Sequence, residues 1–313
     1  MDMIADIGGT NSRCALLNDR GRIIAGETYS NAEFSSLESV LDHYLENRRA
    51  SDRPRRAALA VAAPMLQDSV QMINIDWRFS QAELKERYDL AGLIVVNDFT
   101  ALAWAVPDLI SAELFKVGRG EAAIRSPLAV IGPGTGLGVG ALIPASDGWA
   151  PVTGEGGRVS ISTITCTEAA VADYIRSQSG HCSAEDLLSG PGLVRIYDAL
   201  AKLAAREAPA MTPEEISDAA GDGNPLATEA RAMFFALLGT AAGNLALTID
   251  ARGGVFIGGG IVPRLIEALA ESDFRERFEG KGSYRGYMES IPTYVITDPQ
   301  PAFRGLRKLL GYR

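Results

Sequence analysis

Histidine and cysteine are scarce in this sequence, with two and three copies among 313 residues. The chain has no Cys-x-x-Cys pair, and this absence argues against a structural zinc site. Cysteines that are few and scattered favour a reducing compartment, where thiols pack as small core residues. We therefore expect a cytoplasmic protein without a structural zinc site.

Positive charge is also in short supply. The chain has 30 Lys and Arg against 39 Asp and Glu, which gives a formal net charge of -9. Nucleic acids and anionic membranes both require clustered basic residues, so we expect neither as a partner. The N-terminus lacks the basic and apolar regions of a signal peptide. The longest apolar stretch, 232–249, is interrupted by Asn244 and follows Arg231, so we interpret it as a buried core helix.

Glycine, in contrast, is abundant, and two glycine-threonine loops stand out. The first is Asp6-Ile7-Gly8-Gly9-Thr10-Asn11-Ser12-Arg13, and the second is Gly132-Pro133-Gly134-Thr135-Gly136-Leu137-Gly138. Each follows a short apolar strand and precedes another apolar stretch. Glycines allow the backbone to approach a ligand closely, and successive N–H groups form an anion-binding nest. Two such hairpins, one in each half of the chain, predict a polyphosphate site.

Familiar single-loop motifs fit these two loops poorly. A Walker loop requires Gly-Lys-Ser/Thr, and neither loop contains lysine. A dinucleotide fingerprint must open a helix, whereas the second loop opens onto a strand-like run that ends at Pro144. Two plain hairpin turns are the remaining alternative, and the similarity of the loops in both halves favours phosphate binding.

The order of elements suggests two related halves. Periodicity and turn signals predict strands at 3–8, 13–18, 22–29, 56–62 and 93–96, with helices at 36–48, 80–88 and 100–106. The second half repeats this order in part, with strands near 128–131, 138–143 and 149–153, followed by helices at 167–177, 183–188, 193–206 and 226–249. Thr212, Pro213 and Glu215 predict another helix start. Strands at 254–257 and 294–296 and a terminal helix at 302–311 complete the prediction.

Four sites have residues suited to chemistry on a hydroxylated substrate. Asp98 of Asn97-Asp98 follows a buried strand and is a candidate general base, with helix capping as the alternative. Glu155, among three glycines, is a candidate for binding a polyol, with an exposed turn residue as the alternative.

Glu185 lies in the first turn of a predicted helix, where acids also occur because they complement the helix dipole. Gly258-Gly259-Gly260 lies between a strand and a predicted helix with Pro263 in its first turn, which allows close approach of a base or ribose.

Six motifs in order give the chain a family resemblance. They are Asp6-x-Gly8-Gly9-Thr10-Asn11-x-Arg13, Asn97-Asp98-Phe99-Thr100, Gly132-x-Gly134-Thr135-Gly136-Leu137-Gly138, Gly154-Glu155-Gly156-Gly157, Leu188-Ser189-Gly190-Pro191-Gly192, and Gly253-Gly254-Val255-Phe256-Ile257-Gly258-Gly259-Gly260-Ile261-Val262-Pro263-Arg264. Over nearly its whole length the chain resembles the bacterial glucokinases of the proteobacterial type, within the actin/hexokinase-like ATPase superfamily.

This resemblance implies an α/β fold of two ribonuclease-H-like domains that flank a cleft, a small one at 1–108 plus 299–313 and a large one at 109–298. It implies ATP-dependent phosphorylation of glucose to glucose 6-phosphate in glycolysis, with Mg²⁺, in a cytoplasmic homodimer. Asp98 is then the catalytic base, and the sugar is bound by Asn97, Glu155, Arg158 and Glu185. The nucleotide is bound by Asp6, Gly8, Gly9, Thr10, Asn11, Gly134, Thr135, Gly136, Gly258 and Gly259, with Asp6 positioning the metal through water.

One departure from the family pattern concerns the sugar. Arg158 stands where the family has a histidine that touches the sugar. Arginine donates hydrogen bonds and cannot accept them, and at three residues from Glu155 it is close enough to pair with that carboxylate. We expect the exchange to bear on sugar identity or affinity.

Two alternatives therefore stay open, a kinase for another hexose or amino sugar and a non-catalytic sugar-binding sensor. The first loop begins at residue 6, so we expect no N-terminal DNA-binding segment of the kind that sugar-responsive repressors carry.

Overall fold

The computed structural model describes residues 1–46, 48–49, 52–65, 67–146 and 148–312. Contacts between Cα atoms divide the chain into two compact units. Unit 1 comprises Met1–Ile110, Pro151–Gly154 and Asp298–Arg313, and unit 2 comprises Ser111–Ala150 and Glu155–Thr297. Each unit has its own sheet and its own hydrophobic core, and each is described by itself.

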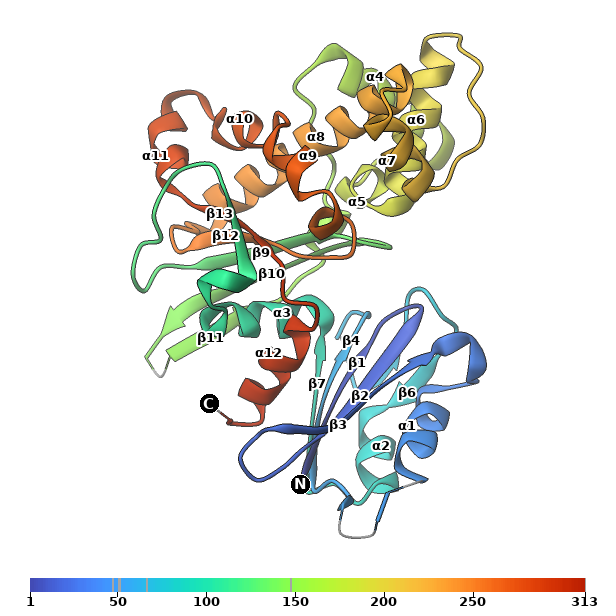
Figure 1. The fold of residues 1–313 in the computed structure, drawn as a ribbon, viewed down its shortest axis with the longest axis vertical. Helices are drawn as coiled ribbons and strands as arrows, with labels where there is room; N and C mark the ends of the chain where they lie inside the picture. The colour runs from blue at the N-terminus through green and yellow to red at the C-terminus, as the bar shows by residue number, and fades with distance from the viewer. Residues whose placement is uncertain (47, 50–51, 66, 147, 313) are drawn as a thin grey trace. The chain divides into compact units, whose positions relative to one another are not determined.

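Unit 1 is built on a five-stranded sheet with the order β3-β2-β1-β4-β7 (Figure 1). The strands are β1 (Asp2–Ile7), β2 (Asn11–Leu17), β3 (Ile23–Ser30), β4 (Arg56–Val61) and β7 (Gly92–Asn97), and a separate hairpin joins β5 (Ser69–Gln71) to β6 (Arg78–Ser80). Strands β1, β4 and β7 are parallel, and Ile7, Val61 and Asn97 are register partners. The segments that follow these three residues therefore emerge at the same edge of the sheet.

Helices cover both faces of this sheet. Helices α1 (Leu37–Glu46) and α2 (Gln81–Arg87) pack on one face, where Leu41 and Leu84 join Leu59 in a core. Helices α3 (Asp98–Ala105) and α12 (Pro301–Leu309) cover the other face. Gly305 allows α12 to lie directly on α3, because a side chain there would overlap the carbonyl oxygen of Ala101. Helix α3, which begins at Asp98, is thereby held against the sheet.

Unit 2 contains a six-stranded sheet with the order β11-β10-β9-β12-β13-β8. Its strands are β8 (Leu114–Val117), β9 (Leu128–Pro133), β10 (Leu137–Ala145), β11 (Gly148–Val152), β12 (Gly254–Ile257) and β13 (Thr293–Ile296). Strand β9 is buried along its whole length and pairs antiparallel with β10 and parallel with β12. This arrangement places the turn between β9 and β10 beside the segment that follows β12.

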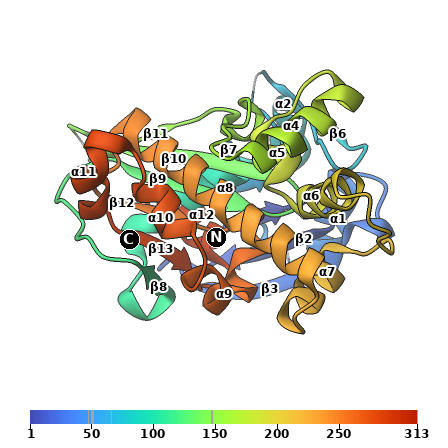
Figure 2. The same cartoon turned by 90° about the horizontal axis from the view of Figure 1, so that it is seen from above.

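The helices of unit 2 gather mainly on one face of this sheet. They are α4 (Cys166–Ser179), α5 (Ala184–Leu187), α6 (Gly190–Leu203), α7 (Pro213–Gly221), α8 (Pro225–Ile249), α9 (Ile266–Ala270), α10 (Phe274–Glu279) and α11 (Arg285–Ser290). Figures 1 and 2 show α8 and α10 lying together over the strands. By length and composition α8 is apolar enough to cross a membrane, but 61% of its most apolar window is buried. It is the core helix that the sequence predicts.

Short 3-10 helices complete the structure: η1 (Asn31–Glu33), η3 (Val106–Asp108), η4 (Ser111–Glu113), η5 (Gly156–Arg158), η6 (Val262–Arg264) and η7 (Gly282–Tyr284). One of them corrects an expectation. No α-helix opens directly after Gly258-Gly259-Gly260, because η6 is interrupted at Leu265 before the five-residue α9 begins. Pro263 lies in the first turn of η6 as expected, but the element that follows the glycine run is a short 3-10 helix and not an α-helix. The predicted helix at 36–48 ends at Glu46, and residue 47 lies outside the described residues.

Candidate functional site

The first glycine-threonine loop connects β1 to β2 in unit 1. The Gly8 N–H donates to the Asn11 carbonyl at 3.0 Å, which closes the turn. Asn31, which is buried, holds the loop from outside by donating from Nδ2 to the Gly8 carbonyl at 2.8 Å and from its backbone N–H to the Thr10 carbonyl at 2.9 Å. The loop is thus fixed by one side-chain and two backbone hydrogen bonds, while Thr10 itself stays exposed.

Asn31 is a positioning residue that sequence reasoning missed, and Asn74 is another residue beside the loop. A side chain at Gly9 would place its β-carbon 2.8 Å from the β-carbon of Asn74, so the loop and Asn74 are in close contact. Asn31 lies 23 residues from Gly8 in the chain, so no local pattern connects it with the loop.

Asp6 lies on β1, close to the beginning of the same loop. Arg13 of β2 pairs with it, and their closest atoms, Nη1 and Oδ2, are 3.2 Å apart. The two residues are register partners on adjacent strands, which explains the contact. Burial raises the pKa of Asp6 above its ordinary value, although the charge and hydrogen bond of Arg13 act in the opposite direction.

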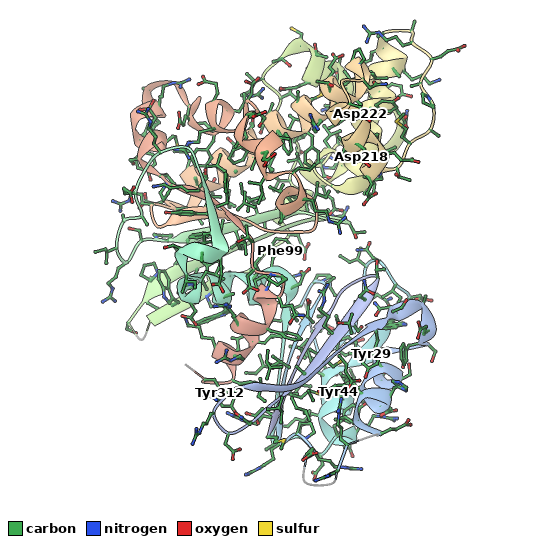
Figure 3. All side chains as sticks on the ribbon, viewed as in Figure 1. Tyr29, Tyr44, Phe99, Asp218, Asp222 and Tyr312 are labelled. Atoms are coloured by element: carbon green, nitrogen blue, oxygen red, sulfur yellow. The ribbon has the colours of Figure 1, made fainter. Side chains whose placement is uncertain are left out.

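Asn97 and Asp98 occupy the junction between β7 and α3. Asn97 is the N-cap, since its side-chain oxygen accepts from the Phe99 N–H at 2.9 Å. Asp98 is the first helical residue and is half-buried, with Oδ1 accepting from the same N–H at 3.0 Å. Phe99, labelled in Figure 3, marks the place of this pair in unit 1. Asn97, and not Asp98, is therefore the N-cap residue of α3. The Asp98 carboxylate lies at the edge of the sheet where β1, β4 and β7 end.

The second glycine-threonine loop is the turn between β9 and β10 in unit 2. The Gly134 N–H donates to the Gly136 carbonyl, and the Gly190 N–H at the beginning of α6 donates to the Gly134 carbonyl, both at 2.8 Å. Gly259 has a φ of +82° and lies so close that a side chain would overlap the Pro133 carbonyl. The loop is thus bound from two sides, and Thr135 at its tip is exposed.

The segment with Glu155 and Arg158 lies flat against β10. A β-carbon at Gly156 would be 2.8 Å from the β-carbon of Val139, and one at Gly157 would overlap the Leu137 carbonyl. Only glycines allow this approach. The Arg158 N–H donates to the Glu155 carbonyl at 2.9 Å and shapes η5. The exposed side chains of Glu155 and Arg158 are therefore presented from a backbone that is tightly fixed to the sheet.

Glu185 connects this segment to the second glycine-threonine loop. Its Oε2 accepts from the Leu137 N–H at 2.9 Å, and its Oε1 is 2.9 Å from Nη2 of Arg158. Arg158 is close enough in sequence to pair with Glu155, but the structure pairs it with Glu185. The turn of η5 directs the guanidinium to α5 instead, where Glu185 lies in the first turn as expected. A β-carbon at Gly136 would be 2.5 Å from Oε2, so Glu185 packs directly on the loop.

The two units therefore hold different parts of the predicted site. Unit 1 brings together the predicted residues Asp6, Gly8, Gly9, Thr10, Asn11, Asn97 and Asp98 at one edge of its sheet. Unit 2 groups Gly134, Thr135 and Gly136 with Gly258 and Gly259. It also groups these loop residues with Arg158 and Glu185, and Glu155 lies on the same segment as Arg158.

A preformed metal cage is absent from the part of the chain that the structure describes, where no group of three or more His, Cys, Asp or Glu side chains comes together. This donor set still fits Mg²⁺, which retains water and commonly binds through one or two carboxylates together with substrate phosphates. Asp6, a single carboxylate at the beginning of a phosphate-type loop, matches that requirement.

Comparison with known families gives one consistent result. A family described as Glucokinase matches residues 3–311. A curated glucokinase from Paramagnetospirillum magneticum is 44% identical over 312 residues, which cover 99% of this chain and 97% of that protein. A bifunctional protein from Paraburkholderia xenovorans is 43% identical over 99% of this chain, which spans about half of that longer relative, 48% of its length.

Comparison with solved structures agrees with the sequence relatives. The crystal structure of a glucokinase from an Antarctic psychrotroph is similar with a TM-score of 0.86 and 35% identity, over 100% of both chains. Because the similarity covers the whole chain, it includes both units and the strand-loop-strand segments that carry the candidate residues.

Proposed function

This chain belongs to the glucokinase family, which uses ATP to phosphorylate glucose to glucose 6-phosphate, and we propose that Asp98 is the general base of that reaction. The observation that best supports the proposal is the shared register of Ile7, Val61 and Asn97. It puts the first phosphate-type loop and the Asn97-Asp98 pair at the same edge of one sheet, the edge where ligands bind in open α/β sheets.

Asp98 is suited to accept a proton from the sugar. Its carboxylate begins α3 beside Asn97, which already caps the helix. As the hydroxyl oxygen of glucose forms its bond to the γ-phosphorus of ATP, the hydroxyl proton passes to the Asp98 carboxylate and ADP leaves. Asn97 fixes the backbone at this point, because its side chain also donates to the Ala63 carbonyl at 3.4 Å.

We propose that the remaining sugar hydroxyls are bound by Asn97, Glu155, Arg158 and Glu185. Support comes from the rigid attachment of η5 to β10 and of Glu185 to the Leu137 N–H. Carboxylates accept hydrogen bonds from sugar hydroxyls, and a fixed backbone reduces the entropy lost when the sugar is ordered. Arg158 already occupies Oε1 of Glu185, so the sugar must either share or displace this guanidinium.

For the nucleotide, we propose that the phosphates are bound by Gly8, Gly9, Thr10 and Asn11 in unit 1 and by Gly134, Thr135 and Gly136 in unit 2. Gly258 and Gly259 then lie beside the base or ribose. Asp6 would hold Mg²⁺ through water, and Mg²⁺ when bound neutralises phosphate charge. We further propose domains at 1–108 plus 299–313 and at 109–298. The two compact units support this division except at Pro151–Gly154, which group with unit 1.

Localisation, oligomeric state and partners are also proposed. We propose a cytoplasmic homodimer without nucleic-acid or membrane partners. The acidic net charge of -9 supports the absence of those partners, and the three free cysteines support a reducing compartment. The Arg158–Glu185 pair also favours a second candidate function, phosphorylation of another hexose or an amino sugar. This candidate rests on the altered hydrogen-bonding capacity of the η5 segment.

A coupled assay of ADP release tests the substrate. With Mg-ATP and a panel of glucose, mannose, fructose, galactose, glucosamine and N-acetylated amino sugars, we expect the highest kcat/KM with glucose. A higher kcat/KM for any other sugar would replace glucose with that sugar as the preferred substrate. Sugar binding without ADP release from any member of the panel would indicate a sensor.

Replacing the base tests the mechanism. Asp98→Asn keeps the side-chain shape but removes the proton acceptor, so we expect kcat to fall at least ~10²-fold with little change in the glucose dissociation constant. Asp76→Asn, an exposed position in the same unit, is the matched control and should retain activity. A folded Asp98→Asn enzyme with near-normal kcat would show that another group removes the proton.

A further inference from the structure

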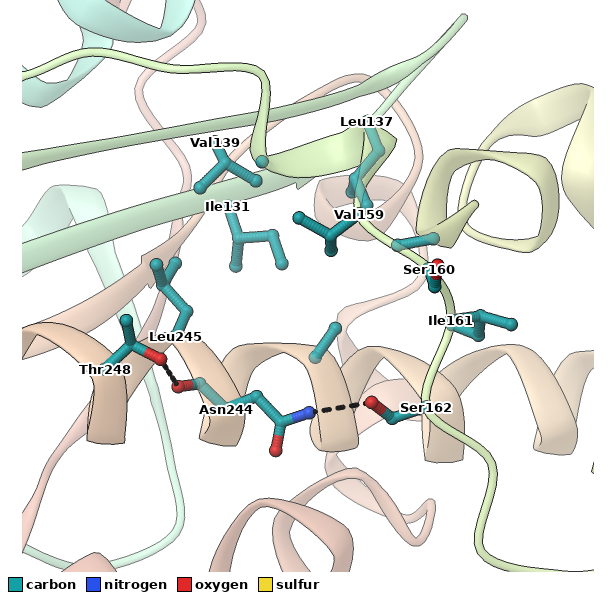
Figure 4. A pocket seen from close by; sticks show the side chains of 13 residues that line it. Ile131, Leu137, Val139, Val159, Ser160, Ile161, Ser162, Asn244, Leu245 and Thr248 are labelled. Carbon is teal, nitrogen blue, oxygen red and sulfur yellow. Dashed lines mark hydrogen bonds between the residues drawn. The ribbon is translucent and has the colours of Figure 1, made fainter. Parts of the chain in front are cut away.

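Unit 2 contains an apolar cavity of about 290 Å³ that the sugar and nucleotide assignments do not use. It lies between strands β9 and β10 on one side and helix α8 on the other (Figure 4). Ile131 and Val139 line it from the strands, and Leu245 lines it from the helix. Small residues at Gly156, Ala184 and Ala241 leave the space between these layers unfilled.

The chemistry of the walls defines the ligand. None of the thirteen described residues around the cavity is charged, and most are aliphatic. The polar members are Ser160 and a group on the helix side, where Asn244 donates from Nδ2 to the Ser162 hydroxyl at 3.2 Å and Thr248 donates to the Asn244 carbonyl at 2.7 Å. Val159 is 59% exposed, so the cavity is open to solvent. A small apolar molecule that enters it removes aliphatic surface from water. A molecule that fits is uncharged and apolar, with at most one small hydroxyl-bearing end.

The cavity shares its walls with the segments that hold the candidate sugar residues. The Ala184 N–H donates to the Val159 carbonyl at 2.8 Å, and both residues line the cavity. Their immediate neighbours, Glu185 and Arg158, form the ion pair described above. A third lining residue, Leu137, donates its N–H to Glu185. The cavity therefore lies directly behind the Arg158–Glu185 pair, within a single unit.

We propose that this cavity binds a small uncharged apolar molecule and that its occupancy alters the affinity of the enzyme for glucose. A ligand there contacts Val159, Ala184 and Leu137 together, and displacement of any of these backbones moves Arg158 or Glu185. Binding of an apolar molecule in the cavity does not depend on the catalytic assignment. The effect on the affinity for glucose rests on the proposed function.

The n-alkanols from butanol to decanol are suitable probes, because each has one hydroxyl and a chain of adjustable length. Calorimetry with the intact protein should show saturable binding that strengthens about fourfold for each added methylene until the cavity is full. Ala241→Leu should weaken octanol binding at least tenfold by filling the cavity. Leu245→Ala should shift the best chain length upward by enlarging it. Ala232→Leu, exposed on the same helix, is the matched control and should bind like the unmodified protein.

Kinetics then test the effect on glucose. Octanol should change the KM for glucose at least twofold, with a half-effect concentration equal to its dissociation constant, and this response should be lost in Ala241→Leu. Absence of saturable binding, or binding that Ala241→Leu leaves unchanged, would overturn the site. Binding with no change in KM would overturn the coupling even if kinase activity is present. Ultracentrifugation tests whether the protein self-associates. If self-association blocks octanol binding and Ala241→Leu abolishes the self-association, the occupant of the cavity would be a second copy of the chain.

Discussion

The effect of Arg158 on the proposed sugar site follows from its contacts. Its backbone is fixed by η5, and its guanidinium pairs with Glu185. The Arg158 side chain is 52% exposed and that of Glu185 is 23% exposed, so solvent screens the pair. Ion pairs of this kind contribute about 0.2–1 kcal/mol, which corresponds to up to about fivefold in affinity. The pair therefore competes with the sugar for Glu185 only weakly.

Arg158→His should accordingly lower the KM for glucose about two- to fivefold, because Oε1 of Glu185 becomes available to the sugar. The KM for ATP should change little. Steady-state kinetics with both substrates measure this effect. Arg195→His is a matched control, since Arg195 pairs at 3.3 Å with Asp186, the neighbour of Glu185. An unchanged KM for every hexose would place Arg158 outside the sugar site, and complete loss of activity would assign it a catalytic role.

Gly134 offers a selective test of the second glycine-threonine loop. A β-carbon there would have its nearest neighbour, the Gly260 nitrogen, at 3.8 Å, so Gly134→Ala should fold normally. The added methyl group would occupy space that we assign to phosphate. Loss of one hydrogen bond to a charged group weakens binding about tenfold or more, and we expect the KM for ATP to rise by that factor.

The control for this substitution is Gly221→Ala on α7, where an added β-carbon meets no atom within 4 Å. It should leave the KM values for ATP and glucose unchanged. Calorimetry with glucose alone completes the test. If Gly134→Ala weakened glucose and ATP equally, the loop would have a structural role instead of a phosphate-binding one.

At the scale of elements, local signals predicted the helix starts best. Thr212, Pro213 and Glu215 predicted the beginning of α7, and the structure confirms a capping box there. Strand β12 is also confirmed at 254–257. Strand β8 and helices α10 and α11 were missed. Edge strands and short helices depend on packing more than on periodicity, and β8 is held mainly by its pairing with β13, far along the chain.

Some residues of the candidate site are marked by a local sequence pattern, and others depend on contacts with distant elements. Motif order made the loops and Asp98 candidates, because these residues occur in short recognisable strings, and Glu185 became a candidate from the first turn of a predicted helix. The pairing of Arg158 with Glu185 was not predicted, since α5 comes 27 residues later and only the folded chain brings Glu185 to η5. Asn31 was missed for the same reason. Contacts that depend on register between distant elements are not encoded in any local string.

Glu168 connects three elements of unit 2 and is the basis of a prediction about stability. It completes the capping box of α4, and its carboxylate pairs with Arg277 of α10, which also donates to Thr240 of α8 at 3.0 Å. Burial raises the pKa of Glu168, but the hydrogen bonds from Arg277 and from the Ile164 and Thr165 N–H groups outweigh it and lower the pKa below the ordinary value of 4.5.

A lowered pKa in the folded state means that the contribution to stability is present above the unfolded pKa and is lost as pH falls through the folded pKa. Glu168→Gln leaves Arg277 buried without its partner, so we expect a loss of about 3 kcal/mol at pH 7, or several degrees in the thermal midpoint. The difference from the unmodified protein should shrink below pH 4.5. Calorimetry at several pH values measures it.

Glu215→Gln is a matched control, because Glu215 completes the capping box of α7 in an exposed position. It should lower the thermal midpoint much less than Glu168→Gln. Equal effects of the two substitutions would show that capping, and not the ion pair with Arg277, is the source of the stabilisation. A difference that stayed constant down to pH 3 would contradict the assigned direction of the pKa shift.

At the scale of the whole molecule, the main feature is that the proposed chemistry is divided between two units with separate cores. The proposed base Asp98 belongs to unit 1, whereas the proposed sugar ligands Glu155, Arg158 and Glu185 belong to unit 2. Neither unit alone has both the proposed proton acceptor and the full set of proposed sugar ligands. If one glucose molecule uses all of these residues, its binding must be detectable in both units.

Hydrogen exchange tests this division directly. Saturating glucose should slow amide exchange at residues 97–99 of unit 1 and at residues 155–159 and 184–186 of unit 2, because bound sugar excludes water and stabilises local hydrogen bonds. A hexose that shows no binding in calorimetry should protect neither set. Asp98→Asn should retain the protection despite its low kcat, since it removes a proton acceptor and not the binding surface. Protection confined to unit 2 would mean that unit 1 does not contact the sugar, and Asp98 would then lose its role as the base.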